Sequence, residues 1–107
     1  MEQPYIYHFD LQDISAPSSG IVSKTLQNDD RSKVVQFCFA PGQELSAHTA
    51  PFPAILQFLR GLATVKLGQD EQSASQGTFV YMTPLLEHGI RAETEVVMLL
   101  IMLKNPK

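Results

Sequence analysis

The sequence has little of several features that would point to particular classes of protein. It contains a single cysteine, Cys38, which excludes a disulfide framework within the chain and suits a reducing compartment. The net charge is −3 and no cluster of Lys and Arg could neutralise a row of phosphates. The N-terminal residues lack a secretory signal, and the longest apolar run, Val96 to Leu103, is too short to span a bilayer. We therefore expect a cytoplasmic protein that binds neither nucleic acid nor membrane.

Amphipathic helical periodicity over eleven or more residues is also missing from the sequence. Glycine and proline instead separate short apolar stretches, which is typical of a β-sandwich or β-barrel. The predicted strands cover residues 5–11, 21–26, 34–39, 54–59, 62–67, 71–75, 79–82, 88–92 and 96–103. Residues 43–47 run from a turn toward His48, and the stretch with Pro51 and Pro53 is expected to be a bend, bulge or edge. At 107 residues, the chain is expected to form one all-β domain. Residues 1–30 would supply N-terminal strands and a loop, and residues 31–107 the barrel.

Two histidines that follow turns mark the candidate site. His48 comes after the turn at Pro41 and Gly42 and precedes an apolar strand, and His88 follows a second turn at Pro84. If the two histidines meet in space, they place two polar groups at the mouth of a barrel. The remaining histidine, His8, is expected to be an exposed strand residue.

The spacing around His48 resembles the first motif of the cupin superfamily, specifically of its small single-domain cupin 2 (RmlC-like) proteins. That motif reads glycine, five residues, His-x-His, three or four residues, glutamate, six residues and glycine. Gly42, His48 and Gly61 stand at matching positions. Ala50 occupies the place of the second histidine, and Ala54 that of the glutamate.

The second cupin motif is also matched in part. Gly77 and His88 fit it, whereas Pro84 comes one place late. Leu85 stands at the position of a glycine and Ala92 at that of an asparagine. The two motifs and their spacer cover roughly half of the chain. The resemblance implies a small double-stranded β-helix, the jelly-roll barrel of cupins.

The resemblance further implies a divalent transition metal, with His48 and His88 as its ligands, because the family binds a metal through these motif positions. Such a site normally has three or four protein ligands. Glu44 could be a third, because it shares strand parity with His48 if that strand is unbroken. Gln57 could also serve, but only if the register shifts in the proline-containing turn before it. The bound metal is therefore an expectation with a degenerate ligand set.

Apolar side chains of the predicted barrel could line a pocket for a small ligand. The candidates are Phe58, Val80, Met82 and Met98. The same residues would serve equally well as ordinary barrel core. No nucleophile with a base and an orienting acid is visible, and no phosphate-binding loop, so we predict no catalytic residue.

We predict a homodimeric, cupin-type protein that binds a small, partly apolar ligand through His48 and His88. The dimer follows from residues 5–11, a predicted strand that needs a sheet edge to join. Two alternatives stay open. One is a metal-dependent enzyme of dioxygenase or isomerase type with a reduced set of histidines. The other is a non-catalytic dimeric sensor or partner domain whose own side chains fill the cavity.

Overall fold

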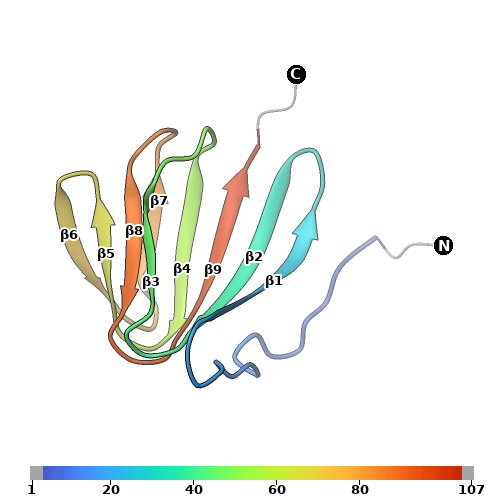
Figure 1. The fold of residues 1–107 in the computed structure, drawn as a ribbon. Coiled ribbons are helices and arrows are strands. Elements are labelled where there is room, and N and C mark those ends of the chain that lie inside the picture. The colour runs from blue at the N-terminus through green and yellow to red at the C-terminus, as the bar shows by residue number, and fades with distance from the viewer. Residues whose placement is uncertain (1–3, 105–107) are drawn as a thin grey trace.

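The computed structural model describes residues 4–104, and every regular element in this range is a β-strand (Figure 1). The strands are β1 (Ile21–Asn28), β2 (Ser32–Phe39), β3 (Glu44–His48), β4 (Ala54–Arg60), β5 (Ala63–Leu67), β6 (Asp70–Ala74), β7 (Phe79–Met82), β8 (His88–Ala92) and β9 (Val96–Leu103). Nowhere between residues 4 and 104 is there a helix long and apolar enough to cross a membrane.

The strands form two antiparallel sheets that pack face to face. One sheet has five strands in the order β1-β2-β9-β4-β7, and the other has four in the order β3-β8-β5-β6. Between them lies a core whose fully buried side chains include Phe39, Leu56, Phe58, Val65 and Met98. This arrangement confirms the all-β, double-stranded β-helix prediction. The strands expected from residue 21 onward all form, with bounds that differ by at most two residues from those expected.

The strand predicted at residues 5–11 is wrong, because residues 4–19 contain no strand. The side chain of Asp10 accepts a hydrogen bond from the N–H of Gln12 at 2.9 Å, and its carbonyl oxygen accepts one from the N–H of Asp13 at 3.2 Å. This local turn bends the chain where the strand would have continued. An aromatic, β-branched segment favours a strand only when a neighbouring strand pairs with it, and no strand of its own sheets does so.

Residues 10–16, here called the strap, instead cross the outer face of the five-stranded sheet. The side-chain amide of Gln36 in β2 donates a hydrogen bond to the carbonyl oxygen of Leu11. Gln36 and Cys38 share this outer face, and both are buried. Burial raises the pKa of the Cys38 thiol, with a further contribution from the Glu95 carboxylate, so the thiol stays protonated and behaves as a small apolar group.

An ion pair holds the strap in place. The guanidinium of Arg60 donates to the carbonyl oxygens of Gln12 at 2.8 Å and Ile14 at 2.9 Å. It also pairs with the carboxylate of Glu95 at 2.7 Å. The second carboxylate oxygen of Glu95 accepts the N–H of Ala16 at 2.9 Å. The strap is therefore fixed at the C-terminal end of β4 and the N-terminal side of β9.

The two ends of the barrel differ in the connections that meet there (Figure 1). The β2–β3, β4–β5 and β8–β9 connections meet at the lower end in the figure, which we call the closed end. The N–H of Gly42 donates to the carbonyl oxygen of Ala92, and that of Glu93 to Leu62, both at 2.8 Å. The β3–β4 and β7–β8 connections meet at the upper end, which carries both motif histidines and is called the histidine end.

Candidate functional site at the histidine end

The structure brings His48 and His88 together. They are direct partners in the antiparallel pairing of β3 with β8, and their ring centroids lie 4.5 Å apart with an angle of 53° between the rings. His88 is only 6% exposed, whereas His48 is open to solvent. The pair therefore has one ring anchored in the protein and one ring at its surface.

A β-bulge turns the side chain of His48 toward His88. Leu45 pairs with Ile90 and His48 with His88, so β3 has one residue more than β8 between the two pairs. The extra residue passes over Gly89, where an added Cβ would lie 3.0 Å from the carbonyl oxygen of Leu45. Glycine at this position therefore leaves room for the bulge.

Each imidazole ring is oriented by a hydrogen bond to a backbone carbonyl. The Nδ1 atom of His48 lies 2.9 Å from the carbonyl oxygen of Ser46, and Nδ1 of His88 lies 2.9 Å from that of Leu86. A carbonyl oxygen can only accept, so each Nδ1 carries the hydrogen. In the neutral ring, Nε2 is then a hydrogen-bond acceptor or a metal ligand. Two such nitrogens are thus presented at one place.

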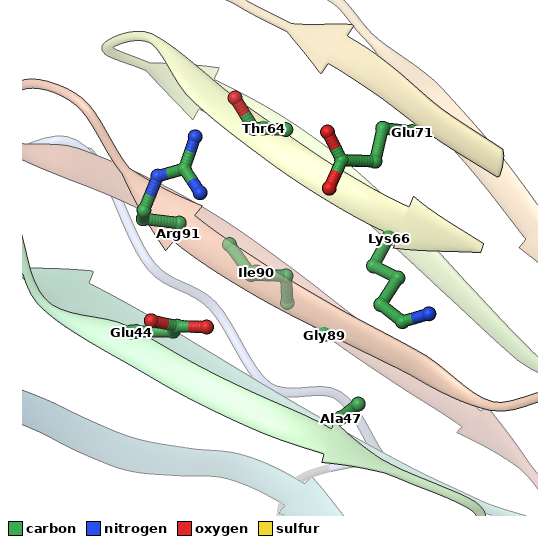
Figure 2. Close-up of a pocket in the computed structure, with 8 residues that line it drawn as sticks. All are labelled: Glu44, Ala47, Thr64, Lys66, Glu71, Gly89, Ile90 and Arg91. Atoms are coloured by element: carbon green, nitrogen blue, oxygen red, sulfur yellow. The ribbon is translucent and has the colours of Figure 1, made fainter. Parts of the chain in front are cut away.

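The bulge separates Glu44 from the histidines. The prediction that Glu44 shares a face with His48 assumed an unbroken strand and is wrong. Glu44 pairs with Arg91 on the outer face of the four-stranded sheet. There it lines a polar hollow of about 70 Å³ with Lys66 and Arg91 (Figure 2). Small-molecule sites usually enclose several hundred Å³, so this hollow is too small for such a ligand.

Gln57 also lies away from the histidines. The pairing of β4 with β7 runs without a shift from Ala54 to Gln57, so no register change turns Gln57 inward. It alternates with the buried Leu56 and Phe58 and faces the opposite side of the sheet. Its side-chain amide donates to the carbonyl oxygen of Thr78 at 3.3 Å.

The metal that the resemblance implies would need protein ligands besides the two histidines. Among residues 4–104, no group of three or more His, Cys, Asp or Glu side chains is placed to hold a metal ion. His48 and His88 offer two imidazole nitrogens, whereas a transition-metal site normally has three or four protein ligands. The residues present therefore do not fit the metal site that the resemblance implies.

The apolar pocket candidates belong to the packed interior. Phe58, Met82 and Met98 are at most 2% exposed and form one cluster, against which the half-buried Val80 packs. They fill space between the sheets. Half-buried apolar groups that border the histidines are Leu67, the pairing partner of His88, and Leu86.

Leu85, which stands at the position of a glycine in the second motif, takes an unusual backbone conformation. Its φ is +71°, in the left-handed region that favours glycine, and its side chain is 68% exposed. The N–H of Leu85 donates to the carbonyl oxygen of Ala50 at 2.8 Å. This bond ties the two motif turns together beside the histidines.

Sequence reasoning could not identify the groups that orient the two rings. The acceptors are backbone carbonyls of Ser46 and Leu86, and any residue type supplies the same carbonyl. Gly89 was a weak indication of the bulge, since glycine within a strand often marks the close approach of another backbone.

No family model and no curated protein matches the chain. Solved structures do. A conserved protein of unknown function from Streptococcus pyogenes matches with a TM-score of 0.85 and 25% identity, over 100% of this chain and 93% of that one. A cupin superfamily protein from Desulfitobacterium hafniense matches with a TM-score of 0.84 and 21% identity, over 98% and 94%. A cupin 2 conserved barrel domain protein from Leptotrichia buccalis matches with a TM-score of 0.80 and 26% identity, over 87% and 45%.

Proposed function

We propose that this chain, which has the cupin fold, binds a small, partly apolar ligand at the histidine end through His48 and His88. The observation that carries the proposal is the shared orientation of the two rings. Each Nδ1 is committed to a backbone carbonyl, which leaves both Nε2 atoms as acceptors. Two convergent polar atoms beside apolar side chains are typical of a small-molecule site.

The chemistry of the two nitrogens restricts the ligand. Neutral Nε2 atoms accept hydrogen bonds, so the ligand should present hydroxyl or N–H donors. Its apolar part would rest on Leu67 and Leu86, which are half-buried and border His88. Because the interior around Phe58 and Met98 is packed, the ligand would lie at the barrel mouth and be small.

This proposal differs from its two rivals in what the histidines do. A metal-dependent enzyme would need them as ligands, and a sensor or partner domain with a filled cavity would not need them for a small molecule at all. Binding at paired acceptors requires neither a metal nor a catalytic residue. The cytoplasmic location stays a prediction.

A binding experiment with matched probes tests the proposal. Catechol carries two hydroxyl donors on an apolar ring, and 1,2-dimethoxybenzene has the same ring without donors. In NMR titrations, we expect catechol to shift the imidazole resonances of His48 and His88, and the dimethoxy compound to bind at least tenfold more weakly. His48→Ala should weaken catechol binding by a similar factor, because the ligand then loses one of its two hydrogen-bond acceptors. His8→Ala is the control and should leave binding unchanged.

Two results would contradict the proposal. The first is equal binding of catechol by the wild type and by the double variant with His48→Ala and His88→Ala, after circular dichroism has shown the variant to be folded. The second is stoichiometric Fe, Mn, Ni or Zn in the purified protein that disappears on His48→Ala. That outcome would favour the metal-dependent rival.

A further inference from the structure

A strained residue with an exposed apolar side chain lies beside the two histidines. Leu85 has a φ of +71°, and its side chain is 68% exposed. Glycine and asparagine adopt this left-handed conformation at a lower cost than leucine does. The leucine side chain also gains little from burial within the chain, since most of it faces solvent. For the stability of the free protein, leucine is therefore an unfavourable residue at this position.

Hydrogen bonds on both sides hold Leu85 in this conformation. Its N–H donates to the carbonyl oxygen of Ala50, two residues after His48, at 2.8 Å. The carbonyl oxygen of the next residue, Leu86, accepts the hydrogen of Nδ1 of His88 at 2.9 Å. The backbone of Leu85 is thus fixed between the two segments that carry the rings. Strained backbone that is fixed in this way is concentrated at ligand sites and switch regions.

The two neighbouring leucines of this turn differ in what they contact. Leu86 is half-buried and packs against the core cluster, and a Cβ added at Gly68 in the β5–β6 turn would lie 3.4 Å from its Cδ1. Leu85 has no such place in the packed barrel, because two thirds of its side chain is open to solvent. A ligand held at the rings would therefore gain more from covering Leu85 than from covering Leu86.

We propose that Leu85 is a specificity-determining residue of the histidine end and selects ligands that carry an apolar substituent beside their donor groups. This inference rests on the proposed function. The donors of the ligand bind the two Nε2 atoms, its ring rests on Leu67 and Leu86, and the substituent covers Leu85. Removing apolar surface of both the substituent and the leucine from water strengthens binding. The site then prefers an alkyl-substituted ligand to the unsubstituted parent.

Catechol and 4-tert-butylcatechol are the matched probes, because they carry the same two hydroxyl donors and differ in one apolar group. In NMR titrations, we expect the wild type to bind 4-tert-butylcatechol at least about fivefold more tightly than catechol. Leu85→Asn should bring this ratio close to one without weakening the binding of catechol, since asparagine tolerates the left-handed conformation and keeps the turn. Leu85→Ala also removes the apolar surface and should have the same effect. Leu85→Met keeps an apolar side chain and should retain the preference.

Leu62→Asn is the matched control for the loss of an exposed leucine. Leu62 is 53% exposed but lies at the closed end, so this variant should keep the wild-type preference. Dispersed amide spectra show that each variant is folded.

Three results would overturn the inference: equal affinity of the wild type for the two probes, a preference that survives in both Leu85→Asn and Leu85→Ala, or a preference that disappears in Leu62→Asn or Leu85→Met. In each case the proposed function would stand as long as the binding of catechol depends on His48. Failure of the wild type to bind catechol would instead contradict the proposed function, and this inference with it.

Discussion

The closed end and the histidine end are built from the same strands but are held together differently. At the closed end, Gly61 has a φ of +94° and packs directly beneath the backbone of Glu95, whose carboxylate pairs with Arg60. At the histidine end, Leu85 has a φ of +71° without being a glycine, and His48 is exposed. The closed end is thus suited to stability, whereas the histidine end stores backbone strain beside accessible polar groups.

This difference divides each cupin-like motif into two parts. Gly42 and Gly61 of the first motif, and Gly77 of the second, lie at or near the closed end, whereas His48 and His88 lie at the other (Figure 1). The strands between them span the barrel. The glycines therefore indicate the scaffold, and the histidines indicate the site. A chain can keep the glycines of the scaffold while its ligand residues change, as Ala50 and Ala54 illustrate.

The largest effect is expected for Gly61→Ala, which would break the closed end. An added Cβ would come 2.0 Å from the carbonyl oxygen of Glu95, a backbone atom that cannot move aside cheaply, and the positive φ adds strain. We expect the free energy of unfolding to fall by about 3 kcal/mol or more. Urea denaturation followed by circular dichroism measures it.

Gly77→Ala provides the matched control for this substitution. Gly77 has nearly the same φ, +95°, but nothing lies within 4 Å of an added Cβ. Only the conformational cost remains, about 1–2 kcal/mol. Equal losses for the two variants would show that the contact with Glu95 does not restrain the closed end.

An intermediate effect is expected for Glu95→Gln, and it should depend on pH. The hydrogen bond from the Ala16 N–H, together with Arg60, lowers the pKa of Glu95 below its ordinary value of 4.5. A lowered pKa in the folded state means that the carboxylate stabilises the protein fully above pH 4.5, and that this stabilisation disappears as the pH falls through the folded pKa. At neutral pH we expect a loss of about 1 kcal/mol, since the pair is partly exposed.

The same substitution should loosen the strap before the barrel unfolds. Cys38 is fully buried beneath it, so its reaction with a disulfide reagent active in acid reports opening. At neutral pH, Glu95→Gln should react faster than the wild type, and the two rates should converge at low pH. A constant difference at all pH values would mean that the Glu95 charge does not hold the strap.

The fold could be predicted well from the sequence, because each strand of a barrel imposes a pattern on the residue types along it. Punctuation by glycine and proline, and short continuous apolar segments such as Val96–Leu103, reflect the strands directly. The location of the candidate site followed from two histidine spacings. The positions of Glu44 and residues 5–11 were predicted wrongly, because they depend on one extra residue in β3 and on whether a partner strand exists. Such features are decided by contacts between distant segments.

The smallest effect, and the only stabilising one, is expected for Leu85→Gly at the histidine end. Glycine removes the left-handed strain of about 1 kcal/mol or more. It also gains freedom in the unfolded chain, which costs about 0.5–1 kcal/mol. We expect a net gain of about 0.5 kcal/mol or less in the free energy of unfolding, measured by urea denaturation. Leu85→Ala keeps the strain and should show no gain. If Leu85→Gly instead destabilises the protein, the exposed leucine side chain stabilises this end by contacts of its own, and the contrast between a strained and an unstrained end would not hold.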